Sequence, residues 1–198
     1  MNELSYKKRA YEEDVAIGGM SLEGIAPSRF PETGATQTQS TDYRLLDAMF
    51  ATVPLRADDT LLDVGCGMGR VLSYLHLHGL GGHLVGIELD PDVAALAKNR
   101  FEGINDVKVL AGNIFDQPKL VAQASSIFMF NPFEGNTMLD FIELIEEHVH
   151  HPLRLYYCAD YYRAFLERRP QWEILAHETV QRADLDPLSY SIYEFVQS

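Results

Sequence analysis

The sequence is poor in cysteine and lacks long apolar runs. Only two cysteines, Cys66 and Cys158, occur in 198 residues, which argues against a disulfide framework and favours reduced thiols in a cytoplasmic protein. No run of 18 apolar residues is present, so we expect no membrane-spanning helix. No apolar stretch follows the charged amino terminus, as a secretory signal peptide would require.

Basic side chains are also scarce. The chain has 16 Lys and Arg against 29 Asp and Glu, a formal net charge of −13. Proteins that hold nucleic acid usually present a basic patch or stripe, whereas the dense basic clusters here are short, at 7–9 and 168–169. Charge therefore favours a small-molecule or protein substrate and disfavours nucleic acid, unless scattered arginines form a local groove. The chain is expected to be a monomer or a homodimer.

Beyond residue 60, short apolar runs alternate with helical patterns. The runs cover 60–64, 83–89, 107–112, 125–130 and 153–159, and such alternation predicts a parallel sheet. Asp90 followed by Pro91 predicts a helix start; Thr137 and Asp160 are predicted to begin two later helices. The strand-like segments 172–182 and 188–197 predict a closing antiparallel hairpin. The predicted fold is α/β: a Rossmann-like, doubly wound, mostly parallel seven-stranded sheet with one antiparallel strand and helices on both faces.

A glycine loop follows the first predicted strand. Asp63 ends the strand, and Gly65, Gly67 and Gly69 come directly before a helix, at the edge where open parallel sheets bind ligands. The spacing differs from the Gly-x-Gly-x-x-Gly of nicotinamide and flavin enzymes. Asp63 would repel a pyrophosphate but can accept hydrogen bonds from a ligand ammonium. A plain tight turn without a ligand is the alternative.

Two further positions at the same edge suit a nucleoside. Glu88 ends the second strand, 19 residues after Gly69, close to the spacing at which a carboxylate takes ribose hydroxyls. After the third strand, the Asn113 amide can donate to and accept from an adenine edge, and Ile114 can cover the ring. The alternative for Asn113 is a turn-stabilising residue.

The segments LLDVGCGMGR (61–70) and VGIELDPD (85–92) resemble the class I, seven-strand S-adenosylmethionine-dependent methyltransferases, and the element order is similar over 60–198. The resemblance implies an enzyme that uses S-adenosylmethionine and releases S-adenosylhomocysteine. It implies a cofactor site that uses the glycine loop for the methionine end, the second strand for the ribose and the third for adenine: Asp63, Gly65, Cys66, Gly67, Gly69, Glu88, Leu89, Asn113 and Ile114.

The amino-terminal residues differ in composition from the rest. Gly, Pro, Ser and Thr are dense over 18–41, which predicts loops and short turns, and a helix is predicted from about Thr41 to Pro54. We expect 1–45 to form a lid or cap segment and 46–198 the methyltransferase domain, with Tyr43 contacting cofactor or substrate. A disordered tail is the alternative for the lid.

Asn131, Pro132 and Phe133 follow the fourth strand and are the predicted acceptor-positioning residues. They partly resemble the Asn-Pro-Pro-aromatic motif of amino-directed methyltransferases, although Phe133 replaces the second proline and Glu134 the aromatic residue. Methyl transfer from an activated donor needs mainly alignment, so no charged dyad is required. A turn that packs Phe133 into the core is the alternative.

The leading function is methylation of a small molecule or protein side chain. The rivals are a nucleic-acid methyltransferase, a non-catalytic S-adenosylmethionine-binding module and, more remotely, a nicotinamide oxidoreductase. No metal site is predicted, because the spacing of His148, His150 and His151 suits a helix end better than one ion.

Overall fold

A mixed seven-stranded sheet forms the centre of the molecule in a computed structural model that describes residues 3–23, 25–26, 29–30, 32, 38–182 and 185–197. The strand order is β5 (Val107–Ala111), β4 (His83–Glu88), β3 (Thr60–Val64), β6 (Ser126–Phe130), β7 (Leu153–Cys158), β9 (Leu185–Phe195) and β8 (Trp172–Arg182). The first five are parallel, and β9 pairs antiparallel with both β7 and β8. The predicted fold class is confirmed.

The register brings the carboxyl ends of the central strands together. Val64 at the end of β3 pairs with Ile87 of β4 on one side and with Met129 of β6 on the other. Four of the five residues in β3 and in β6 are buried, as expected for parallel strands covered on both faces. Residues just beyond these ends therefore share one edge of the sheet.

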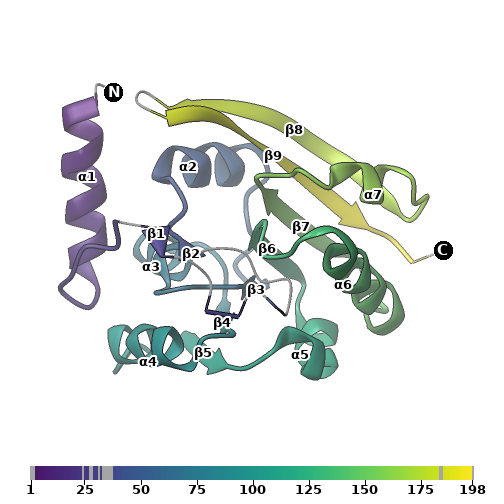
Figure 1. The fold of residues 1–198 in the computed structure, drawn as a ribbon, viewed down its shortest axis with the longest axis horizontal. Helices are drawn as coiled ribbons and strands as arrows, with labels where there is room; N and C mark the ends of the chain where they lie inside the picture. The colour runs from purple at the N-terminus through teal and green to yellow at the C-terminus, as the bar shows by residue number, and fades with distance from the viewer. Residues whose placement is uncertain are drawn as a thin grey trace.

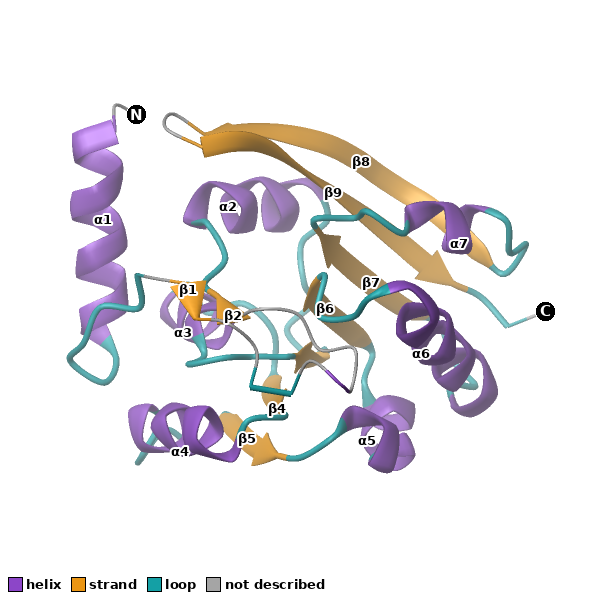
Figure 2. Cartoon of the chain, viewed as in Figure 1, coloured by secondary structure: helices purple, strands orange, loops and turns teal. Residues whose placement is uncertain are grey.

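Helices cover both faces of the sheet (Figures 1 and 2). On one face α2 (Tyr43–Thr52), α3 (Arg70–Leu77) and α4 (Pro91–Arg100) contribute to one core cluster, and on the other α5 (Pro118–Gln123), α6 (Gly135–His148) and α7 (Arg163–Glu167) contribute to a second. Asp90 caps α4 as predicted, because its carboxylate accepts from the Asp92 amide at 2.9 Å. No helix in the described ranges is long and apolar enough to cross a membrane.

Two predicted helix starts are wrong. Helix α6 begins at Gly135, after Glu134, rather than at Thr137, because Gly135 adopts a φ of 37° that lets the chain turn into the helix earlier. Helix α7 begins at Arg163, and Asp160 does not cap it. The Asp160 carboxylate instead accepts hydrogen bonds from hydroxyl groups of β9, which a local pattern does not reveal.

A helix also occupies residues 3–16 of the amino-terminal segment, for which no secondary structure was predicted. Helix α1 (Glu3–Ala16) buries Tyr6, Ala10 and Asp14 and packs on α3. These residues lie at i, i+4 and i+8 and form one narrow stripe. Because the stripe contains one large apolar side chain and one carboxylate, it lacks the usual hydrophobic periodicity. The short strands β1 (Ile25–Ala26) and β2 (Thr38–Gln39) pair antiparallel beyond it.

Candidate active site

The loop between β3 and α3 approaches its neighbours so closely that side chains would not fit. Gly65, Gly67 and Gly69 have φ values of 74°, 53° and 85°, a region that glycine adopts without strain. A Cβ on Gly69 would lie 2.5 Å from the ring of Phe101, and one on Gly65 would lie 3.2 Å from Pro132. The Gly65 amide donates to the Ile87 carbonyl at 2.9 Å, so the loop is held against the end of β4.

Asp63 is a buried carboxylate near the end of β3. The residue is 2% exposed, and its Oδ2 has no hydrogen-bond partner among the described residues. Burial, and then the nearby charge of Glu88, raise the pKa of Asp63 well above its ordinary value. An unsatisfied buried carboxylate is costly, and a bound cation would remove that cost.

Glu88 is fixed in orientation but not saturated. Its two carboxylate oxygens accept from the backbone amides of Gly67 and Asp90, each at 2.9 Å. Burial raises the pKa of Glu88, while these amide bonds oppose the rise. Since an ionised carboxylate offers about four acceptor sites, these bonds leave acceptor capacity for hydroxyl groups of a ligand. The side chain is thus a preoriented acceptor beside the glycine loop.

The remaining predicted cofactor residues lie near this edge in different settings. The Cys66 thiol is buried, and burial raises its pKa, so it lacks the character of a nucleophile. Leu89 is half-buried and Ile114 is buried. The Asn113 side-chain oxygen accepts from the Phe115 amide at 3.1 Å, which stabilises the short 3₁₀ helix Ile114–Asp116. Contacts of these four residues with a cofactor stay predictions.

Tyr43 lies inside the core rather than on an open surface. It is 0% exposed, and its hydroxyl donates to Asp14 at 2.8 Å. The guanidinium of Arg70, directly after the glycine loop, lies 5.1 Å from the centre of the Tyr43 ring. The structure therefore gives Tyr43 a structural role between α1 and α3, and its contact with a ligand stays a prediction.

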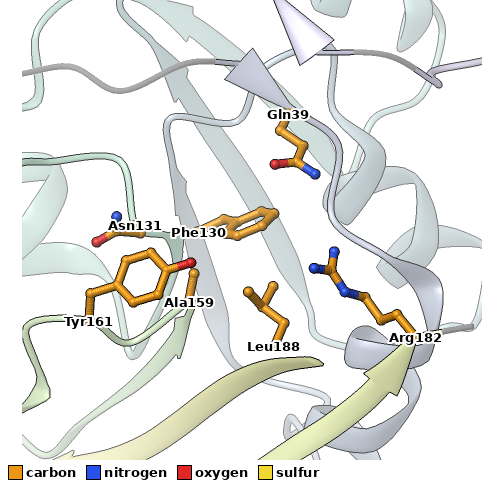
Figure 3. A pocket seen from close by; sticks show the side chains of 7 residues that line it. All are labelled: Gln39, Phe130, Asn131, Ala159, Tyr161, Arg182 and Leu188. Atoms are coloured by element: carbon orange, nitrogen blue, oxygen red, sulfur yellow. The ribbon is translucent and has the colours of Figure 1, made fainter. Parts of the chain in front are cut away.

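A pocket of about 170 Å³ opens beside Asn131, at the carboxyl ends of β6 and β7 (Figure 3). Asn131 has a φ of 37°, and its side-chain oxygen accepts from the Tyr157 hydroxyl at 2.9 Å. Residues from β2, from the loops after β6 and β7, and from the β8–β9 hairpin complete the lining: Gln39, Phe130, Asn131, Ala159, Tyr161, Arg182 and Leu188.

Of the three predicted acceptor residues, only Asn131 lines this pocket. Pro132 faces the glycine loop at Gly65. Phe133 is buried on the other face of the sheet, with its ring centre 5.0 Å from Phe141 and 5.6 Å from Phe115. The ring of Phe133 contributes to the core, and its stacking on an acceptor stays a prediction.

The three histidines near the end of α6 have separate hydrogen-bond partners. His148 bonds the Leu144 carbonyl at 3.1 Å, and His151 bonds the Ala122 carbonyl at 3.0 Å. Within the described ranges, no three His, Cys, Asp or Glu side chains are grouped as a metal ion would require.

Residues 61–151 match the family model described as a methyltransferase domain. This segment contains the glycine loop, Glu88 and Asn131, and the sheet order and parallel register described above belong to the seven-strand architecture. The chain contains a class I methyltransferase domain. The predicted resemblance is therefore confirmed.

Known proteins similar to this methyltransferase domain differ in the acceptors that their names give. Ribosomal RNA small subunit methyltransferase A of Geobacter sulfurreducens is 34% identical over 76 residues, which are 38% of this chain and 27% of that protein. An RNA methyltransferase of Salinibacter ruber, solved with S-adenosyl-L-homocysteine, superposes with a TM-score of 0.57 at 19% identity, over 79% of this chain and 92% of that one. A precorrin-6y C5,15-methyltransferase of Geobacter metallireducens gives 0.59 at 12% identity, over 87% and 94%.

These similarities establish the fold and leave the acceptor open. The matched segment spans about a quarter of the ribosomal RNA enzyme's length, and the structural relatives are too distant in sequence to carry more than the fold. Since two of the three act on RNA by name, they lend no support to the charge argument against nucleic acid.

Several residues of the site region were not predicted. Arg70 stands at the end of the segment 61–70, yet its partner Asp14 lies 56 positions earlier. Tyr161 follows the fifth parallel strand and could have been found from the rule that ligands bind beyond strand ends. Arg182 and Gln39 gave no signal, because a hairpin and a short strand distant in sequence bring them to the pocket.

Proposed function

We propose that the protein is an S-adenosylmethionine-dependent methyltransferase. The observation that carries the proposal is the pair of carboxylates at adjacent strand ends, with bare glycine backbone between them. Asp63 would accept from the amino group of the methionine end, and the open acceptor sites of Glu88 would take the ribose hydroxyls. Both fit the cofactor, because one is a buried carboxyl group whose Oδ2 has no partner among the described residues and the other is a preoriented acceptor.

The sulfonium supplies an already activated methyl group, so the residues of this chain have mainly to orient the acceptor and exclude water. Alignment of two reactants accounts for about 7–11 kcal/mol of a barrier. Asn131 lies where an acceptor would enter, and its side chain is held by Tyr157. A fixed amide at the pocket wall can position an acceptor through its hydrogen bonds without a charged dyad.

The amino-terminal segment forms a cap in this proposal. Arg29 ties it to the loop after Glu88, since its guanidinium pairs with Asp90 at 2.6 Å and with Asp92 at 2.8 Å. Gln39 of the same segment lines the pocket beside Asn131. The cap therefore reaches both the nucleoside side and the acceptor side of the site.

The acceptor is proposed to be a small molecule or a protein side chain, on the grounds of the −13 charge. A nucleic-acid acceptor is the second candidate. It is favoured by the names of two relatives and by the Asn131–Pro132 sequence that resembles amino-directed enzymes.

The first experiment measures binding of S-adenosylhomocysteine by isothermal titration calorimetry. Glu88→Ala should weaken binding by about 10- to 100-fold, because hydrogen bonds to a charged group contribute about 1.5–3 kcal/mol. Glu102→Ala, at an exposed position after α4, is the matched control and should bind normally. Unchanged affinity in Glu88→Ala, or no heat with the unmodified protein, contradicts the proposal. Formation of S-adenosylhomocysteine from labelled cofactor in a cell extract separates an enzyme from a binding module.

A further inference from the structure

We propose that the pocket beside Asn131 binds a small aromatic acceptor that carries a negative group, with Arg182 pairing with the negative group and Tyr161 stacking on the ring. This inference rests on the proposed function and names the class of acceptor for the same site.

Arg182 is the one charged side chain among the residues that line the pocket, and its guanidinium points into the space between Gln39 and Leu188 (Figure 3). Its Nε donates to the Asp186 carbonyl at 2.7 Å, which fixes the end of the side chain and leaves the terminal nitrogens directed inward. Within the described part of the chain, no carboxylate forms an ion pair with it. A planar guanidinium presents a donor pair that matches a carboxylate or a phosphate.

Other arginines of this acidic protein contrast with Arg182. Arg9 pairs with Asp47, Arg29 with Asp90 and Arg70 with Asp14, at 2.5–2.6 Å. Among the described residues, Arg182 faces its pocket without a carboxylate partner, although the chain contains 29 acidic residues. An anionic ligand would supply the missing partner.

Tyr161 presents its ring at the mouth of the same pocket and is 68% exposed. The backbone that carries it is firmly held. The Tyr161 amide donates to the Ala159 carbonyl at 2.7 Å, and the Ala159 amide donates to Ser189 of β9 at 2.9 Å. Between them, the buried Asp160 carboxylate accepts from the hydroxyls of Ser189 and Ser191. An exposed aromatic ring on a fixed loop gains contact area at little entropic cost when a flat ligand stacks on it.

The rest of the pocket suits the body of such a ligand and places it next to the glycine loop. Phe130 and Leu188 supply apolar walls, while Asn131 and Gln39 supply amide groups that can both donate and accept. Asn131 precedes Pro132, which approaches Gly65. An acceptor bound here therefore lies beside the residues proposed to hold the methionine end.

Size and charge favour a small molecule over RNA. The pocket measures about 170 Å³ and offers one guanidinium, whereas RNA binding depends on several cations that track a phosphate backbone. The net charge of −13 opposes the approach of a polyanion but penalises a single negative group much less.

Matched pairs of probes test the proposal by calorimetry on protein saturated with S-adenosylhomocysteine. One pair is 4-hydroxybenzoate with 4-hydroxybenzamide, and the other is adenosine 5′-monophosphate with adenosine, so that carboxylate and phosphate are distinguished. A single-stranded RNA oligonucleotide is the fifth probe. The anionic member of one pair should bind about tenfold more tightly than its neutral partner, as a charge-assisted contact predicts.

Two variants test whether Arg182 causes the preference for the anionic probe. Arg182→Gln should abolish this preference while leaving the affinity for S-adenosylhomocysteine unchanged. Arg168→Gln makes the same charge change at an exposed position after α7 and should retain the preference.

Three results overturn the proposal: equal affinity within both pairs, no binding of any of the four small probes, or a preference that survives in Arg182→Gln. RNA binding that depends on Arg182, with the small anions unbound, also overturns it and assigns the site to nucleic acid. Failure of S-adenosylhomocysteine to bind the unmodified protein would instead refute the proposed function.

Discussion

Two buried aspartates of this protein have opposite surroundings. Asp14 of α1 is 0% exposed and accepts hydrogen bonds from Arg70 at 2.6 and 2.9 Å, from the Tyr43 hydroxyl at 2.8 Å and from the Leu22 amide at 2.8 Å. Asp63 at the end of β3 is almost as deeply buried, yet its Oδ2 has no partner among the described residues.

The difference separates structure from function. A buried carboxylate surrounded by donors holds elements together, and here it joins α1 to the residue that follows the glycine loop. A buried carboxylate without donors destabilises the ligand-free fold, and a protein retains such a group where a ligand provides the partner. Asp14 therefore belongs to the scaffold, whereas we propose that Asp63 belongs to the cofactor site.

The largest expected effect is loss of stability when Asp14 is removed. Asp14→Ala should lower the free energy of unfolding by about 3–5 kcal/mol, because it leaves the Arg70 guanidinium buried and unpaired. Urea denaturation measures the change. Glu12→Ala on the same helix removes only an exposed carboxylate 3.8 Å from Lys8 and should cost less than about 0.5 kcal/mol. If the two variants were equally stable, α1 would not be part of the scaffold.

Asp63→Asn should act in the opposite direction on the ligand-free protein. Replacing a buried carboxyl group, whose ionisation burial disfavours, by a neutral amide should raise the melting temperature without ligand. The change should also weaken binding of S-adenosylmethionine by about 10- to 100-fold, because a charge-assisted contact is lost. Thermal unfolding with and without the ligand measures both effects. A variant that is destabilised without ligand, as Asp14→Ala is expected to be, would place Asp63 in the scaffold instead.

The same comparison explains what the sequence could predict. The sheet, the glycine loop and Glu88 follow from local patterns: apolar runs, glycine spacing and an acid at a strand end. The environment of Asp14 and the pocket around Arg182 do not follow from local patterns. The partners of Asp14 lie 29 and 56 residues from it along the chain, and the pocket residues come from β2, β6, β8, β9 and the loops after β6 and β7. Helix α1 escaped prediction for the same reason, since its buried stripe includes a charge that is satisfied only by distant donors.

Helix-start motifs were the least reliable local signal. Asp90 caps α4 as its position before a proline predicts, whereas Asp160 has the same type of side chain before a helical pattern and does not cap α7. Its carboxylate is taken by Ser189 and Ser191 of β9, so a tertiary contact outcompetes the local one. These bonds from β9 to Asp160 hold the loop that presents Tyr161.

The smallest expected effect is a pH dependence of cofactor binding that arises from Asp63. Burial and the charge of Glu88 raise its pKa in the ligand-free fold, so between about pH 4 and that raised pKa the folded state binds a proton that the unfolded state has released. The stability contributed by this proton is fully present below the ordinary pKa and is lost as pH rises through the raised value.

A ligand ammonium favours the ionised carboxylate, so binding should release a proton in this window, and affinity should rise by at most about tenfold per pH unit. Calorimetry in two buffers of different ionisation enthalpy measures the proton, and Asp63→Asn should release less; equal release by both proteins would assign the effect to Glu88, whose pKa is also raised.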